Sequence, residues 1–163
     1  MTGRKNMLAI ALGALCIGVV FYALGRQHSH VYFLPSWLPL GNYQLGIFDS
    51  LGDCLPTFIH AYAFILLTVI VTATSIDKII PICVAWFTLD SLFEIAQINV
   101  IAKWISPHIP GWFSGIPFLE NTENYFLFGT FDINDLLSIA AGSVAAYLTV
   151  HLTQEGLHIE KRN

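Results

Sequence analysis

Two carboxylates and one amide interrupt an apolar segment that is long enough to cross a membrane. The segment covers residues 79–100 and contains Asp90, Glu94 and Gln97. A carboxylate near the centre of a bilayer costs about 2.5–3.5 kcal/mol on insertion scales, so such groups normally face protein or water. Residues i, i+4 and i+7 of a helix lie along one face. The spacing therefore predicts one polar face, and an intramembrane polar site is the first functional hypothesis.

Further polar residues are expected at a similar depth on two neighbouring helices. With a rise of about 1.5 Å per residue, His60 lies about 7 Å and Glu94 about 9 Å below the same membrane surface. On the same scale Asp90 lies deeper, at about 15 Å. Asp132 and Asp135 fall in the first turns of the last apolar segment. Carboxylates gathered in this way can share a proton or a cation, so these residues form a candidate ligand-binding cluster.

Each of these residues also has a structural interpretation, which the sequence leaves open. An aspartate at the start of a helix can cap free N–H groups and interacts favourably with the helix dipole, which applies to Asp132 and Asp135. Glu94 and Gln97 can form a buried hydrogen bond between helices, and His60 can do the same. One histidine with several carboxylates is compatible with a divalent cation. The chain has no HExxH or paired-histidine spacing, so we predict neither a metal nor another cofactor.

Composition places these residues in a membrane protein. The chain has 163 residues, of which 55% are hydrophobic and only 11% are charged, whereas soluble domains carry about 25% charged residues. The windows with the length of a membrane span, about 17–25 residues, are residues 7–24, 55–76, 79–100 and about 132–152. We expect one all-α domain over residues 1–163, an integral membrane bundle of four transmembrane helices. The net charge of −4 and the lack of a basic cluster argue against a nucleic-acid partner.

The distribution of basic residues predicts the orientation. One side would carry Arg4, Lys5, Lys78, Lys161 and Arg162, and the other would carry Arg26 and Lys103. Five against two places both termini in the cytoplasm. The two long connections, residues 25–54 and 101–130, would then lie outside, and both are rich in aromatic residues. Such segments can anchor the chain at the membrane surface or form a surface for an amphipathic ligand or a partner.

Three short elements, in order, resemble the VanZ-like family of small membrane proteins. Residues 92–97 fit its E-x-x-Q element, and residues 129–137 fit its D-x-x-D element, which is followed by Gly142. Residues 56–64 resemble its H-x-x-x-[YF] helix. The resemblance covers roughly residues 53–148. It implies a multi-pass protein of the bacterial inner (plasma) membrane, with His60, Glu94, Gln97, Asp132 and Asp135 around one polar site. The helical spacing adds Asp90 to these residues.

Three functions follow as hypotheses. The first is an envelope protein whose outer-leaflet polar pocket binds the head group of a lipid or a cell-wall precursor. The second is an accessory subunit, because the small residues of segment 140–146 allow close packing with partner helices. The third is an enzyme that uses Glu94 and an aspartate as acid and base. The family often has arginine before the D-x-x-D element, whereas this chain has Phe128-Gly129-Thr130. The missing arginine weakens anionic head-group binding and strengthens the subunit hypothesis, which stays second to the first.

Overall fold

The chain folds into helices. The computed structural model describes residues 2–25, 49–72, 78–117 and 119–160, and this part contains no strand. The long helices are α1 (Thr2–Gly25), α2 (Asp49–Thr72), α3 (Ile79–Ile95) and α6 (Ile133–Glu160). The short ones are α4 (Asn99–Ile105), η3 (Ser106–His108), η4 (Gly111–Phe113) and α5 (Thr122–Phe128). Predicted features in residues 26–48 and 73–77, including most of the first outer connection and of the turn at 75–78, lie outside the described residues.

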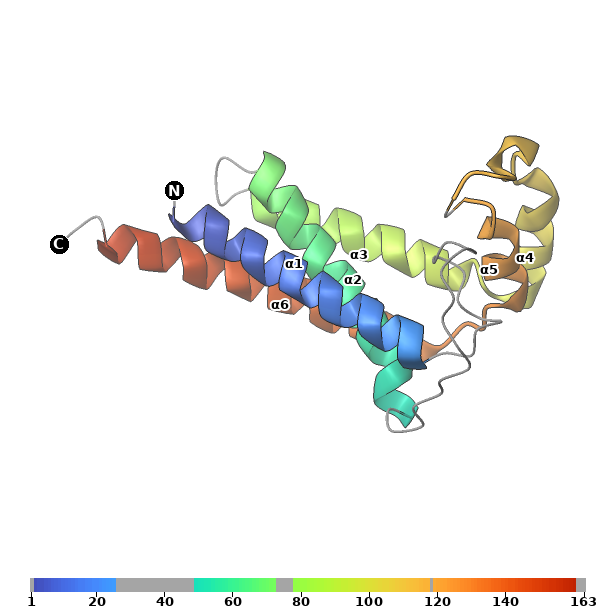
Figure 1. The fold of residues 1–163 in the computed structure, drawn as a ribbon, viewed down its shortest axis with the longest axis horizontal. Coiled ribbons are helices and arrows are strands. Elements are labelled where there is room, and N and C mark those ends of the chain that lie inside the picture. Colours follow the sequence, from blue (N-terminus) through green and yellow to red (C-terminus); the bar gives the residue numbers. More distant parts are fainter. Residues whose placement is uncertain (1, 26–48, 73–77, 118, 161–163) are drawn as a thin grey trace.

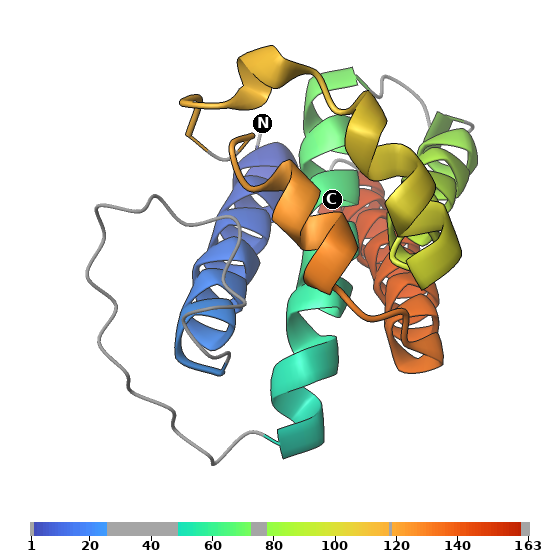
Figure 2. The same cartoon turned by 90° about the vertical axis from the view of Figure 1, so that its right-hand side faces the viewer.

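The four long helices lie side by side, and the short helices cross one end of them (Figures 1 and 2). The first residues of α1 and the last residues of α6 lie together at the opposite end (Figure 1). We call the end near α4 and α5 the bend end, because α3 stops there while α2 and α6 begin there. The chain therefore runs up and down through the bundle.

Three helices are long and apolar enough to cross a membrane, with windows at Gly3–Tyr22, Cys54–Thr72 and Ile133–Thr153. A fourth crossing passes the same test only when α3 and the following segment are taken together, and that pair is bent by 95°. Alone, α3 has 17 residues, which corresponds to about 25 Å, slightly less than the hydrocarbon core of about 30 Å. The structure thus has three or four candidate spans.

The prediction of one continuous helix over residues 79–100 is wrong at its C-terminal end. After Ile95 the backbone tightens, with Gln97 N donating to Glu94 O at 3.1 Å and Ile98 N donating to Ile95 O at 3.0 Å. Ile98 then becomes extended, with φ −59° and ψ 124°, and α4 begins. Neither proline nor glycine stands at this break, so the apolar pattern alone does not reveal it. Helices α1 and α6 also extend beyond their predicted windows, because apolar runs mark the membrane region rather than helix ends.

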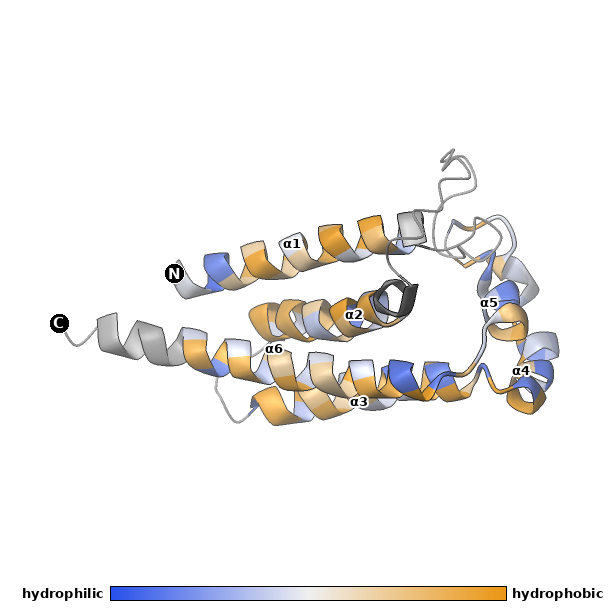
Figure 3. Cartoon of the chain, turned by 90° about the horizontal axis from the view of Figure 1, so that it is seen from below, coloured by the Kyte–Doolittle hydropathy of each residue, from blue (hydrophilic) through white to orange (hydrophobic). Residues whose placement is uncertain are grey.

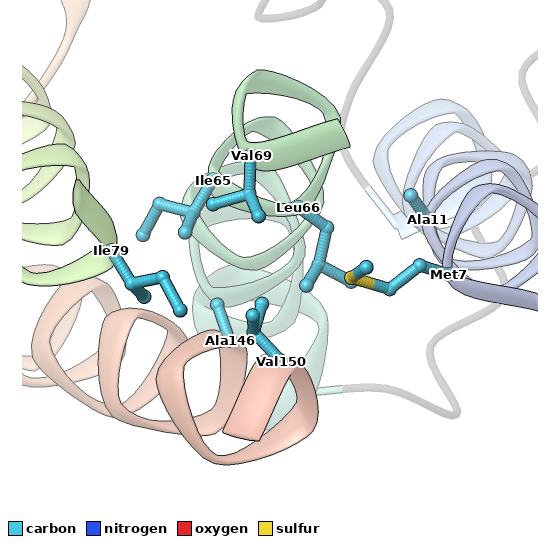
Figure 4. Packing of buried hydrophobic residues seen from close by; sticks show 8 residues of the cluster. All are labelled: Met7, Ala11, Ile65, Leu66, Val69, Ile79, Ala146 and Val150. Atoms are coloured by element: carbon cyan, nitrogen blue, oxygen red, sulfur yellow. The ribbon is translucent and has the colours of Figure 1, made fainter. Parts of the chain in front are cut away.

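The apolar core joins all four long helices, with α2 at its centre. Ile65 and Leu66 of α2 are fully buried. The remaining members of this cluster are Met7, Ala11, Val69, Ile79, Ala146 and Val150 (Figure 4). By contrast, many apolar side chains on the outside of the bundle are exposed, such as Ile17 at 53% and Val71 at 82%. Figure 3 shows apolar residues over most of the long helices. This arrangement is consistent with a multi-pass membrane protein, whose outer surface meets lipid rather than water.

Glycine and other small residues bring α6 against α2. A Cβ atom on Gly142 would lie 2.5 Å from the backbone oxygen of Phe58 and 3.3 Å from the Cβ atom of Ala61. Ser143 and Ala146 are buried as well. Segment 140–146 was predicted to contact partner helices, and its buried members, Gly142, Ser143 and Ala146, pack within the chain. Contacts of its other members with a partner stay a prediction.

The position of the two chain ends predicts a topology that can be measured. Four crossings return the chain to the side where it started, whereas three crossings leave its ends on opposite sides. We expect reporters fused at residue 1 and after residue 163 to report the same side of the membrane. A reporter pair that is active on opposite sides would contradict four crossings and would mean that α3 does not traverse the bilayer.

Candidate functional site

Glu94 is the centre of a hydrogen-bonded cluster at the bend. Glu94 is only 5% exposed. Its Oε1 atom accepts a hydrogen bond from the backbone N–H of Asp132 at 2.7 Å, and its Oε2 atom accepts one from Gln97 Nε2 at 3.1 Å. The carboxylate therefore joins the end of α3 to the start of α6. We call Glu94, Gln97, Tyr125 and Asp132 the bend cluster.

Gln97 extends the bend cluster to α5, although it lies in the break after α3 and not on the predicted helical face. Its Nε2 atom also donates to the hydroxyl group of Tyr125 at 2.9 Å. Gly129 allows this packing, because a Cβ atom there would collide with the side-chain oxygen of Gln97 and with the carbonyl oxygen of Tyr125. The amide therefore bridges three segments, and the backbone at residue 129 has no room for a side chain.

The two aspartates of the D-x-x-D element begin α6. Asp132 Oδ1 accepts a hydrogen bond from the backbone N–H of Asn134 at 2.9 Å, which is an N-cap contact. In a capping box the acidic residue three positions later would bind the N–H of the cap residue. Here Glu94 of α3 binds that N–H instead. The capping interpretation of Asp132 is confirmed, and its cap is completed by a residue from another helix.

Asp135 connects α6 to α2. Its Oδ1 atom accepts a hydrogen bond from the hydroxyl group of Thr57 at 2.8 Å. Thr57 lies three residues before His60, so the two fall near one face of α2. Thr57 and Tyr125 were not among the predicted site residues. The position of Thr57 relative to His60 was a usable signal, whereas Tyr125 was one of many aromatic residues in its connection.

His60 and Asp90 form a pair between α2 and α3. His60 Nδ1 lies 3.4 Å from Asp90 Oδ2, and the side chains are 50% and 10% exposed, respectively. Against an ionised Asp90 carboxylate, which can only accept, the hydrogen of this contact is on Nδ1. The imidazole ring lies beside two aromatic rings that also contact each other, with centroid distances of 4.4 Å to Phe64 and 6.1 Å to Trp86. The pair is the candidate site with the greatest access from outside.

Ser91 directly follows Asp90 in the sequence of α3. Its Oγ atom is buried and has no hydrogen-bond partner in the part of the chain that the structure describes. A buried polar group without a partner costs about 1–3 kcal/mol. Folding stability therefore gives no account of a hydroxyl at this position.

The six predicted site residues all lie in the half of the bundle next to the bend. His60 is in the first half of α2, Asp90 and Glu94 are in the second half of α3, and the two aspartates stand at the start of α6. Their described hydrogen bonds form three groups, which are the bend cluster, the Asp135–Thr57 contact and the His60–Asp90 pair. A direct link among His60, Glu94 and Asp135 stays a prediction. Within the described ranges, no group of three or more histidine, cysteine or acidic side chains could hold a metal ion.

No family model, no curated protein and no solved structure matches the chain.

Proposed function

We propose that this chain is a VanZ-like protein of the bacterial inner membrane that binds the head group of a lipid or a cell-wall precursor in the outer leaflet. The observation that carries the proposal is the His60–Asp90 pair. The His60 side chain is 50% exposed on a helix of membrane-spanning length, while the side chain of its partner Asp90 is 10% exposed. A polar ring exposed to hydrocarbon is costly unless another polar group meets it.

The chemistry of the pair fits a head group. With Nδ1 donating to Asp90, the Nε2 atom can accept a hydrogen bond from a hydroxyl group, or, when protonated, donate one to a phosphate oxygen. Phe64 and Trp86 add apolar surface beside the ring. His60 and Phe64 are also the two defining positions of the H-x-x-x-[YF] element. Their ring contact at 4.4 Å gives that spacing a physical role.

The bend cluster supports a different role for Glu94, Gln97 and Asp132. The Glu94 oxygens accept from the Asp132 backbone and from Gln97, and the Asp132 carboxylate caps α6. These contacts hold three segments together at the bend. We therefore assign ligand binding to the His60–Asp90 pair and structural support to the bend cluster. For the same reason, acid–base catalysis by Glu94 is the weakest of the three functional hypotheses.

An accessory subunit remains the second candidate function. The exposed aromatic residues Trp104 and Trp112, at 68% and 65%, would provide contacts for partner helices. The same half-exposed His60 would then meet a polar group of a partner chain instead of a head group. An arginine before the D-x-x-D element would provide a positive charge for an anionic head group. Its absence from this chain supports the subunit alternative.

Removing His60 should weaken lipid retention. We expect His60→Ala to lower the amount of phosphatidylglycerol or undecaprenyl phosphate retained by the purified protein, as measured by native mass spectrometry. Loss of one hydrogen bond to a charged group, about 1.5–3 kcal/mol, corresponds to a roughly tenfold or larger change in affinity. Asp90→Asn should have a smaller effect in the same direction, because the amide still occupies the position next to Nδ1.

His151→Ala is the matched control. His151 lies in the half of α6 that is away from the bend end, and its ring contacts Tyr147 at a centroid distance of 6.0 Å. This variant should retain lipid like the unchanged chain. If His60→Ala retains both lipids normally but loses a co-purifying membrane protein, head-group binding is wrong and the subunit function is favoured.

A further inference from the structure

The chain turns sideways where α3 ends. The axis after the break makes an angle of 95° with α3, and α4 and α5 lie across the end of the bundle (Figures 1 and 2). If the long helices cross the membrane, this segment runs along its surface. We call residues 99–128 the surface layer.

The surface layer has its own small core. Ala102 of α4 and Phe126 of α5 are buried together with Ala96 from the break. Ile101, Ile105, Ile109 and Tyr125 pack against them. A hydrogen bond of 2.6 Å from Ser106 Oγ to Glu123 Oε1 closes the contact between the two halves of the layer. The layer is thus a folded unit, and the bend cluster attaches it to α3 and α6.

Large apolar side chains remain exposed on this unit. Val100 is 79% exposed, Trp104 68% and Trp112 65%. Leu92 and Phe93, in the last turn of α3 before the break, are also exposed, at 57% and 45%. The apolar outer surface of the long helices therefore continues into the layer. Lys103, next to Trp104 in the sequence, is exposed as well and adds a positive charge.

We propose that the surface layer lies in the head-group region of the membrane and that lipid covers Trp104 and Trp112. Three observations favour lipid as the occupant. The layer begins where the exposed apolar surface of α3 ends, and its axis is turned across the bundle. The most exposed aromatic residues in residues 99–117 and 119–128 are tryptophans. Tryptophan is enriched at the membrane–water interface because its ring is apolar while its N–H group needs a polar partner. Lys103 is suited to lipid phosphates at the same level.

The test uses tryptophan fluorescence in vesicles of phosphatidylcholine and phosphatidylglycerol. The full-length protein with Trp37→Phe is compared with a variant that also carries Trp104→Phe and Trp112→Phe. Trp104 and Trp112 are exposed, so their replacement leaves the core of the layer intact. The difference between the two signals reports Trp104 and Trp112. The remaining signal reports Trp86, which lies near the middle of α3 and serves as the depth control.

We expect lipids brominated near the head group to quench the difference signal more strongly than lipids brominated near the end of the acyl chain. Trp86 should show the opposite order. Quenching of the difference signal by aqueous iodide, without quenching by either lipid, would show that the layer lies in water and would overturn the proposal. Stronger quenching by the deep lipid would also overturn it, because the layer would then be inserted into the hydrocarbon. Neither result depends on head-group binding at His60.

Discussion

Glu94→Ala is expected to destabilise the protein by about 1–3 kcal/mol, the range for leaving a buried donor without its hydrogen-bond partner. The reason is that two donors lose their acceptor at once. The Asp132 N–H group at the start of α6 and the Gln97 amide both bind this carboxylate. The measurement is unfolding in a mild detergent, combined with hydrogen exchange at the Asp132 amide. That amide should exchange faster in the variant.

Two further variants make the test specific. Glu94→Gln keeps an oxygen that can accept from Asp132, so it should recover most of the lost stability. Glu123→Ala removes an exposed carboxylate that is bound to Ser106 in the surface layer and should have a much smaller effect. Equal stability of Glu94→Ala and the unchanged chain, with unchanged exchange at Asp132, would show that the bend cluster does not hold the bend.

Gly142→Ala is expected to separate α2 from α6. The new methyl group would meet the backbone oxygen of Phe58 at 2.5 Å, and backbone cannot move aside as a flexible side chain can. Overpacking of this kind costs about 1–3 kcal/mol. Unfolding in detergent measures the loss, and a cysteine pair placed across the α2–α6 contact should cross-link less readily.

Gly13→Ala provides the matched control, because the same chemical change is made in the middle of α1. A Cβ atom at residue 13 would have nothing within 4 Å in the described structure. Alanine favours helix over glycine by about 1 kcal/mol, so this variant should be as stable as the unchanged chain or more stable. If the two variants behave alike, the close approach of α2 and α6 is not what requires glycine at residue 142.

The sequence predicted those features that depend on local chemistry. Apolar length located α1, α2 and α6, and the aspartate before an apolar run indicated the cap at Asp132. Each of these depends on residues a few positions apart, which a sequence pattern records directly.

The bend and the pairings between helices could not be predicted in this way. Residues 95–99 contain no helix-breaking residue, and the contacts that surround the break come from Tyr125 and Asp132, which lie far along the chain. The pairing of His60 with Asp90 depends on which faces of α2 and α3 meet. The apolar sequence of the two helices does not determine those faces. Whether these residues bind a ligand stays a prediction.

The cap of α6 is shared between two helices, and this has a consequence for the order of assembly. Glu94 precedes Asp132 by 38 residues in the chain, so it is synthesised first. When α6 is synthesised, the Glu94 carboxylate that accepts from the Asp132 N–H group is already present at the end of α3. The last helix to be made therefore completes its first turn only by meeting one that is already in place. We expect correct insertion of the third helix to be a condition for a well-formed start of the last one.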